Sequence, residues 1–246
     1  MPQKMLYWMG RRTVDLVARA VLDINILYHE ELMPGPKIIA PNHPTTLDPF
    51  IITIVAPEQI HVLITESAFK APVLGEYLRQ SGHVPVVMGH GGDAFAEGRR
   101  LLDEGKTIAI FPEGALSPEG KVSRPHTGIA RLAILSGAPV IPIGIALDRQ
   151  RVRPLDTGIP KPDGGTEIAR LYLGGPYFLT LGVPMRLNGY VDDREFVAVQ
   201  TKRIMRHIIR LSRMSEFRIQ GTELPKGAIE TNAIGAISIP FEIPGS

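Results

Sequence analysis

Two side chains that can move a proton stand five residues apart near the start of the chain. The segment Pro41–Pro49 holds His43 and Asp48 between two short apolar runs, the second of which has helical character. If Thr45 or Thr46 caps that helix, Asp48 lies in its first turn and the loop with His43 folds back onto the carboxylate. A carboxylate that accepts one ring N–H leaves the other imidazole nitrogen to take a proton. The spacing is that of a general base and its orienting acid, although a solvent-facing histidine beside a capping aspartate has the same pattern.

A second polar loop follows a buried strand later in the chain. The apolar run Thr107–Phe111 leads directly into Pro112, Glu113 and Gly114. Open α/β sheets bind ligands outside the carboxyl ends of their strands, and His43 also follows a strand. We therefore expect the two loops to share one edge of a sheet. The alternative is a plain turn in which Gly114 supplies an unusual backbone angle and Glu113 is solvated.

The elements that must position these loops alternate between strand and helix, which predicts an α/β fold with a mixed central sheet flanked by helices. Several strands are continuous apolar runs, as expected of strands covered on both faces. The predicted strands are Asp23–Tyr28, Lys37–Ala40, Gln59–Ile64, His83–Val87, Thr107–Phe111, Val140–Ile145 and Tyr177–Leu181. The predicted helices are Met5–Leu22, Asp48–Val55, Val73–Gln80, Asp93–Glu104, Thr127–Ser136 and Asp193–Met214. The Arg-, Pro- and Gly-rich segment Arg149–Thr166 is predicted to be a long basic loop.

The composition suits one domain and excludes several classes of site. The chain has 246 residues and a formal net charge of +2, so no nucleic-acid partner is expected. It contains no cysteine, which excludes disulfides, thiolate zinc sites, iron–sulfur clusters and a cysteine nucleophile. The histidines lack metal-ligand spacing, so no metal site is predicted. We also expect no secretory signal and no transmembrane helix, because no uncharged run reaches about 18 residues.

Three blocks together carry a resemblance to a known family. Asn42-His43-x4-Asp48, then Phe111–Gly114, then the apolar strand Val140–Ile145 resemble, in order and spacing, the glycerolipid acyltransferase superfamily. The most similar type is the 1-acyl-glycerol-3-phosphate acyltransferase, which acylates lysophosphatidic acid. The resemblance spans about residues 37 to 145.

That resemblance implies transfer of a fatty acyl group from acyl-CoA or acyl-carrier protein to an acceptor hydroxyl. In that reaction His43 takes the hydroxyl proton, and Asp48 orients the imidazole of His43. The resemblance implies no acyl-enzyme, metal or prosthetic group. Asn42, Glu113 and Gly114 match blocks implied to bind the acceptor. Backbone N–H groups near Gly114 or beside His43 are candidate donors to the oxyanion.

The chain departs from the family pattern where arginines are implied to bind the acceptor phosphate. Met88 and Leu116 occupy those two positions. A charge-assisted hydrogen bond contributes about 1.5–3 kcal/mol, so other cations must replace them if the acceptor carries a phosphate. Alternatively, Met88 and Leu116 line an apolar pocket for an acceptor without one. The candidate replacements are Lys70, Lys121, Arg124, His126 and Arg131.

The N-terminal segment 1–22 is predicted to be an interfacial helix of a single acyltransferase domain, 1–246, with a C-terminal extension at 221–246. One face carries Arg11, Arg12, Asp15 and Arg19, and the other carries Leu6, Met9, Leu16, Val17 and Ala20. A helix with basic and apolar faces can lie in a bilayer interface. Because the resemblance implies a lipid acceptor that must reach the site, we expect a peripheral protein on the anionic cytoplasmic face of the cell membrane, in an oligomeric state that the sequence leaves open. The alternative is a helix packed on the protein's own core.

Two other functions fit the same residues. In a thioesterase or lipid hydrolase, water would replace the acceptor at the dyad of His43 and Asp48. A serine hydrolase is not expected, because the Gly-x-Ser-x-Gly motif is absent. The second possibility is a lipid-binding protein that keeps the fold without catalysis.

Overall fold

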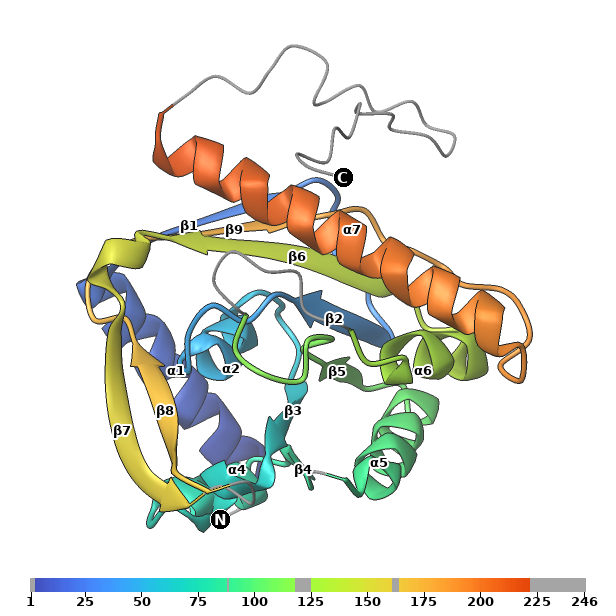
Figure 1. The fold of residues 1–246 in the computed structure, drawn as a ribbon, viewed down its shortest axis with the longest axis horizontal. Helices are drawn as coiled ribbons and strands as arrows, with labels where there is room; N and C mark the ends of the chain where they lie inside the picture. Colours follow the sequence, from blue (N-terminus) through green and yellow to red (C-terminus); the bar gives the residue numbers. More distant parts are fainter. Residues whose placement is uncertain (1–2, 88, 118–124, 161–163, 222–246) are drawn as a thin grey trace.

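A mixed sheet organises the computed structural model, which describes residues 3–87, 89–117, 125–160 and 164–221 (Figure 1). The sheet has seven strands in the order β1-β9-β6-β2-β5-β3-β4. Neighbours pair in parallel except β6 and β9, which are antiparallel, so β1 and β9 run opposite to the other five. The predicted α/β class with a mixed sheet is confirmed. The strands are β1 (Leu22–Tyr28), β2 (Lys37–Pro41), β3 (Ile60–Thr65), β4 (Val84–Val86), β5 (Thr107–Ala109), β6 (Val140–Leu147) and β9 (Gly175–Leu181).

Helices cover both faces of this sheet, which explains why its strands are continuous apolar runs. Ile38 and Ile39 are adjacent on β2 and fully buried, yet they belong to two separate core clusters. Residues of α1 (Gln3–Val21), α2 (Asp48–Ile51), the 3-10 helix η1 (Ile52–Ile54), α3 (Glu66–Lys70) and α4 (Leu74–Gln80) join the cluster of Ile39. Residues of α5 (Gly91–Asp103), α6 (Gly128–Ser136) and α7 (Arg194–Ile219) join the cluster of Ile38.

The long helix α7 lies directly against β6 and β9 (Figure 1). A glycine allows this approach. A Cβ added at Gly144 in β6 would lie 1.9 Å from the backbone nitrogen of Ser212 and 2.0 Å from the carbonyl carbon of Leu211. Asp193 begins the helix by accepting a hydrogen bond from the Phe196 N–H at 2.9 Å.

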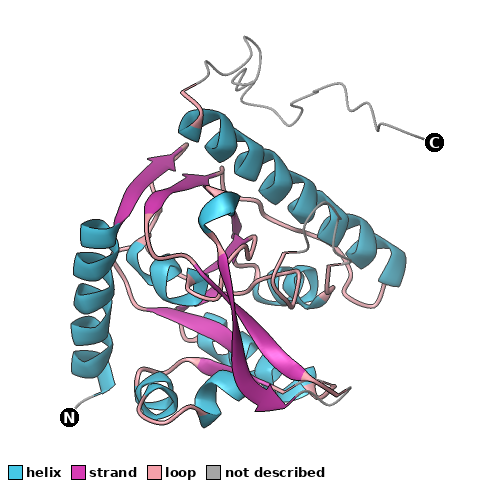
Figure 2. Cartoon of the chain, turned by 60° about the vertical axis from the view of Figure 1, so that its left-hand side comes forward, coloured by secondary structure: helices cyan, strands magenta, loops and turns pink. Residues whose placement is uncertain are grey.

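The segment predicted to be a long basic loop is instead a hairpin. After the 3-10 helix η2 (Arg149–Arg151), strand β7 (Arg153–Pro160) pairs antiparallel with β8 (Thr166–Leu171) in a separate two-stranded sheet. Figure 2 shows these two strands as long ribbons crossing in front of the body. Pro154 and Gly158 are tolerated because a two-stranded ladder has open edges and because the register shifts between Asp156 and Pro160. Their presence made the segment look like a loop.

The N-terminal helix forms as predicted, but the side chains that face the body of the protein differ from those predicted to do so. Tyr7 and Ala18 are buried against the body. Arg11, predicted to lie on the basic face, points inward and donates to the carbonyl oxygens of Thr53 and Ala56, each at 2.9 Å. The predicted apolar residues Met9, Leu16, Val17 and Ala20 are exposed, and Leu6 is half-buried.

Part of the sequence-based prediction lies outside the described residues. This applies to the extension 221–246 beyond Gly221 and to Met88, Lys121 and Arg124. In the part of the chain that is described, no helix is long and apolar enough to cross a membrane.

Candidate active site

The structure brings His43 and Asp48 together at the end of β2. The Nδ1 atom of His43 lies 2.9 Å from the Oδ2 atom of Asp48. The imidazole is partly exposed, with 16% of its side chain accessible, whereas the Asp48 side chain is fully buried. The His43 ring also packs on the Phe111 ring, with centroids 4.2 Å apart. One imidazole nitrogen therefore faces a buried carboxylate, and the other, Nε2, makes no hydrogen bond with the described residues.

Asp48 lies in the first turn of α2 as predicted, but neither threonine caps that helix. The N-cap position is Leu47, and it makes no side-chain capping hydrogen bond. Thr45 instead turns toward Asp48 itself: its N–H donates to Oδ2 at 2.8 Å and its hydroxyl donates to Oδ1 at 2.5 Å. The loop thus closes on the carboxylate, because a buried charge must be hydrogen-bonded.

A tyrosine from a distant strand also binds Asp48. The hydroxyl of Tyr177, near the start of β9, donates to Oδ1 at 2.7 Å. Burial raises the pKa of the Tyr177 phenol well above its ordinary value, and the charge of Asp48 raises it further. The phenol is therefore protonated and acts as a donor. Sequence reasoning missed Tyr177, which is 129 residues away from Asp48 in the chain.

Asn42 fixes the start of the His43 loop to the sheet. Its side-chain amide donates to the Ile145 carbonyl at 2.9 Å and accepts from the Ile145 N–H at 2.6 Å. Both ends of the buried amide are therefore bonded to the backbone of β6. These contacts anchor the loop to β6. The role of Asn42 in substrate binding stays a prediction.

The second loop is joined to the first through backbone and side-chain hydrogen bonds. The His43 N–H donates to Oε1 of Glu113 at 3.2 Å and to the Ser117 hydroxyl at 3.0 Å. The Ser117 N–H donates back to the His43 carbonyl at 2.7 Å, and its hydroxyl donates to Glu113 at 2.5 Å. The prediction that both loops share one edge of the sheet is correct in this geometry. Glu113 is buried, and it holds the loops together from there.

Gly114 and His126 lie in direct contact at the surface of the second loop. Gly114 has φ = +67°, and a Cβ added there would lie 2.5 Å from ring atoms of His126. The backbone N–H of His126 donates to the Pro112 carbonyl at 2.8 Å, and its side chain is exposed. The positive φ favours glycine at 114, and an added Cβ would displace the exposed His126 ring.

The hairpin β7–β8 supplies a cation that the sequence did not identify. The Arg170 guanidinium donates to the Ser117 carbonyl at 2.6 Å. Its backbone exchanges two hydrogen bonds with Thr46, of 2.9 and 3.0 Å. Arg170 thus touches both site loops, and no carboxylate of the described residues lies within ion-pair distance of it.

Other predicted residues are not joined to the dyad. Lys70, at the end of α3, is exposed and pairs with Glu66 at 3.2 Å. Arg131, on α6, is exposed and lies over the Phe95 ring. Leu116 is half-buried next to Ser117. Among the described residues no cluster of three or more histidine or carboxylate groups could hold a metal.

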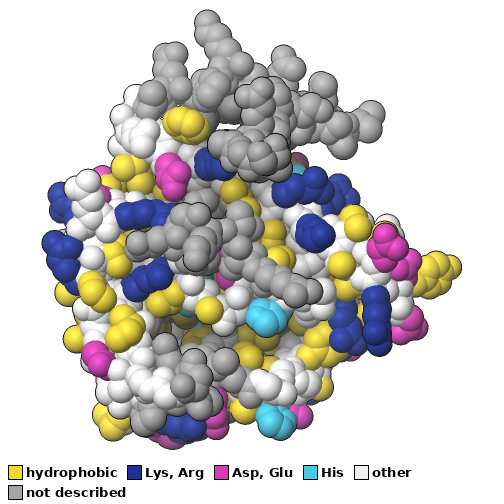
Figure 3. Space-filling view, viewed as in Figure 1, with side chains coloured by type: hydrophobic (Ala, Val, Ile, Leu, Met, Phe, Trp, Pro, Cys, Tyr) yellow, Lys and Arg dark blue, Asp and Glu magenta, His cyan; other side chains and the backbone are white. Residues whose placement is uncertain are grey.

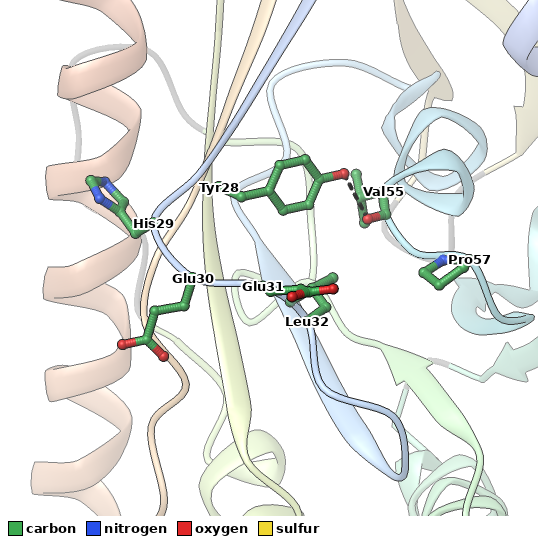
Figure 4. A pocket seen from close by; sticks show the side chains of 7 residues that line it. All are labelled: Tyr28, His29, Glu30, Glu31, Leu32, Val55 and Pro57. Atoms are coloured by element: carbon green, nitrogen blue, oxygen red, sulfur yellow. Dashed lines mark hydrogen bonds between the residues drawn. The ribbon is translucent and has the colours of Figure 1, made fainter.

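An open cleft of about 440 Å³ lies away from this site, around the end of β1. Figure 4 shows Tyr28 pointing across the cleft to the Val55 carbonyl, to which it donates at 2.9 Å. Because β1 runs opposite to β2, its carboxyl end lies at the opposite edge of the sheet from His43. None of the predicted site residues lines this cleft. Its lining residues are Tyr28, His29, Glu30, Glu31, Leu32, Val55 and Pro57.

Comparison with known proteins identifies the family. The acyltransferase family model matches residues 24–146, half of the chain. The chain is 23% identical to the 1-acyl-sn-glycerol-3-phosphate acyltransferase of Bacillus subtilis (strain 168) over 191 residues, 75% of this chain and 86% of that protein. It is 29% identical over 112 residues, 44% of this chain, to the chloroplastic 1-acyl-sn-glycerol-3-phosphate acyltransferase BAT2 of Brassica napus. The match spans only about a third (32%) of that relative's length.

A solved structure shares the fold. The crystal structure of the 1-acyl-sn-glycerophosphate (LPA) acyltransferase PlsC from Thermotoga maritima aligns with a TM-score of 0.58 and 22% identity, over 91% of this chain and 81% of that one. The predicted resemblance is confirmed, and the matched segment contains His43, Asp48 and Glu113. With its fold and its family match in agreement, the chain belongs to the acyltransferase family, within the glycerolipid acyltransferase superfamily.

Proposed function

We propose that the protein is an O-acyltransferase that moves a fatty acyl group from an acyl thioester to a hydroxyl of a lysophospholipid. The observation that carries the proposal is the 2.9 Å contact between Nδ1 of the partly exposed His43 and the buried Asp48. The names of the relatives support an acceptor of the 1-acyl-glycerol-3-phosphate type.

In this reaction Nε2 of His43 takes the proton of the acceptor hydroxyl while its oxygen attacks the thioester carbonyl. The tetrahedral intermediate then collapses to the new ester, and the thiolate leaves and takes the proton from His43. Asp48 accepts the Nδ1–H throughout and balances the charge of the imidazolium. The acyl group passes directly to the acceptor, from acyl-CoA or acyl-carrier protein as donor.

The oxyanion of the intermediate needs N–H donors, and two of the predicted ones already have partners. The His43 N–H donates to Glu113 and Ser117, and the Gly114 N–H donates to the Phe111 carbonyl at 3.0 Å. The next backbone N–H groups, those of Ala115 and Leu116, make no hydrogen bond within the described residues. We assign the oxyanion to this pair.

Arg170 supports an acceptor that carries a phosphate. A guanidinium has five N–H donors, and among the described residues Arg170 uses one for the Ser117 carbonyl. Because Arg170 contacts both site loops, we propose that it binds the phosphate of an acceptor whose hydroxyl reaches His43. Figure 3 shows further basic side chains on the left of this face, over η2 and the hairpin, and Arg149, Arg151 and Arg153 are exposed there. His126, Lys70 and, outside the described residues, Arg124 are secondary candidates.

The exposed stripe of α1 supports attachment to a membrane surface. Met5, Met9, Leu16, Val17 and Val21 are all more than two-fifths exposed, with Leu16 at 72%. At helical spacing Arg12 and Arg19 border this stripe on one side. An apolar stripe beside cations matches the hydrocarbon and the anionic head groups of a bilayer. This arrangement fits a peripheral enzyme that takes its acceptor from the cytoplasmic leaflet.

The proposal is tested with the variant His43→Ala and the control His29→Ala, a histidine of the cleft at the opposite edge of the sheet. Thiol release and lipid products are followed by absorbance and mass spectrometry, with one acyl thioester and a panel of phosphorylated and phosphate-free lysolipids. We expect product formation to fall by about 10²–10⁴-fold in His43→Ala only. If His43→Ala retains its activity within a fewfold, His43 is not the general base and the proposed mechanism is wrong.

The same assay separates transfer from hydrolysis. A transferase releases thiol in proportion to the acceptor added and forms an acylated lipid. Thiol release that ignores the acceptor, with only free fatty acid as product, identifies the thioesterase alternative instead. A preference for phosphate-free acceptors would favour the apolar-pocket reading of Met88 and Leu116.

A further inference from the structure

Tyr177 makes one of the most buried polar contacts in the described part of the molecule. The side chains of Tyr177 and Asp48 are both fully shielded from solvent, and the hydroxyl lies 2.7 Å from Oδ1. Because neither side chain is exposed, the carboxylate takes its hydrogen bonds from protein groups.

The two oxygens of Asp48 have different partners. Oδ2 accepts from His43 Nδ1 and from the Thr45 N–H, whereas Oδ1 accepts from the Thr45 and Tyr177 hydroxyls. Thr45 belongs to the same short loop as Asp48. Tyr177 is the only partner of Asp48, among the described residues, that comes from another part of the sheet. It therefore ties the loop's carboxylate to the rigid core.

We propose that Tyr177 is a positioning residue for the transfer reaction: its hydroxyl holds the Asp48 carboxylate in the orientation in which Oδ2 faces His43. This inference rests on the proposed function, because it concerns the same base. Tyr177 lies beyond the matched family segment 24–146, so the family match assigns it nothing.

A hydrogen bond from Tyr177 to Asp48 affects the pH dependence of the reaction, whereas a tyrosine that only packs in the core does not. Each donor to Oδ1 withdraws charge from the carboxylate and weakens its hold on the imidazolium of His43. Removing the donor leaves a more basic carboxylate, which stabilises the imidazolium, so His43 must be deprotonated at higher pH to act as a base. The acidic limb of the pH profile of kcat/KM then moves to higher pH.

The test compares Tyr177→Phe with Tyr172→Phe. Tyr172 is a matched control: it is 1% exposed, its ring centroid lies 6.3 Å from that of Tyr177, and its hydroxyl donates to the Pro176 carbonyl at 2.8 Å. It makes no hydrogen bond to Asp48. Both variants lose one buried hydroxyl, so a general loss of stability affects both.

We expect Tyr177→Phe to lower kcat by about 10-fold with KM unchanged and to move the acidic limb upward, while Tyr172→Phe changes neither. A second variant places 3-fluorotyrosine at position 177. Its more acidic phenol is a stronger donor, so the acidic limb must move to lower pH. This variant keeps the ring and the hydroxyl, and it decides the question if Tyr177→Phe does not fold.

The inference is overturned if Tyr177→Phe and Tyr172→Phe have the same kcat and the same acidic limb. It is also overturned if 3-fluorotyrosine at position 177 leaves the acidic limb unchanged. His43→Ala is measured alongside. If it loses activity while Tyr177→Phe matches the control, only the role of Tyr177 is wrong. If His43→Ala remains active, the proposed function is itself wrong.

Discussion

Protonation of His83 is expected to destabilise the fold at mildly acidic pH. His83 is 6% exposed, and its ring centroid lies 6.1 Å from that of Tyr7 in α1 and 6.4 Å from that of Tyr77 in α4. Its Nδ1 accepts a hydrogen bond from the Val62 N–H at 3.2 Å, so that nitrogen must be unprotonated. Burial lowers the pKa of the His83 imidazole from 6.5 to about 4, with a smaller effect from His61.

The magnitude follows from the difference between the folded and unfolded pKa values. Between pH 6.5 and about 4, His83 is protonated in the unfolded chain but neutral in the folded chain. The stabilisation is therefore complete above pH 6.5 and is lost as the pH falls toward 4. A pKa difference of one unit corresponds to about 1.36 kcal/mol, so His83 contributes about 3 kcal/mol to the pH-dependent free energy of unfolding.

Urea unfolding between pH 4 and 7.5 measures this contribution. The single tryptophan, Trp8, lies against Tyr7 with ring centroids 5.4 Å apart and reports the transition by fluorescence. The test variant is His83→Asn, whose side-chain oxygen can still accept from Val62, and the control is the exposed His90→Asn. From pH 7.5 to pH 4 the free energy of unfolding of the wild type should fall by about 3 kcal/mol more than that of His83→Asn. Parallel curves for both proteins refute the reasoning.

Three further predictions concern the acceptor, the membrane and the core. Arg170→Met should raise KM for a phosphorylated acceptor by about 10–100-fold and leave KM for a phosphate-free one unchanged, as steady-state kinetics will show; equal effects on both disprove phosphate binding. Leu16→Glu should abolish sedimentation with anionic vesicles, whereas Val199→Glu on α7, 49% exposed, should not; unchanged sedimentation removes α1 from the membrane contact. Gly144→Ala should lower the free energy of unfolding by about 3 kcal/mol, because its Cβ meets fixed backbone atoms. Gly98→Ala, where the Cβ would meet only side-chain atoms at 3.5 Å or more, should cost nothing in the same urea titration.

The elements of the fold were largely predictable because their signals are local. The continuous apolar runs of β2 and β6 follow from helices on both faces, and Gly137 ends α6 in the left-handed conformation that such a helix end favours. The order of the strands has no local signal: β1 pairs with β9 across about 150 residues. The hairpin β7–β8 was missed because its exposed ladder lacks an apolar alternation and contains Pro154 and Gly158.

The same distinction applies to the site. His43 and Asp48 are five residues apart, so their contact could be read from a single loop. Tyr177 and Arg170 reach that loop from 129 and 124 residues away, and only the closed sheet brings them there. A weak signal for Tyr177 did exist, because a tyrosine within an apolar strand needs a buried partner for its hydroxyl.

The reversed direction of β9 has a consequence for how this chain can be divided. Tyr177 pairs with Leu147, so the start of β9 stands at the rim where β6 and β2 end. If β9 ran in the same direction as β6, its last residues would stand there in place of Tyr177. A fragment cut at the boundary of the matched segment, residue 146, would keep His43, Asp48 and Thr45 but lose Tyr177, one of the two hydroxyls that donate to Oδ1 of Asp48. Transplanting the segment 24–146 into another scaffold would therefore require a hydroxyl donor to be engineered in its place.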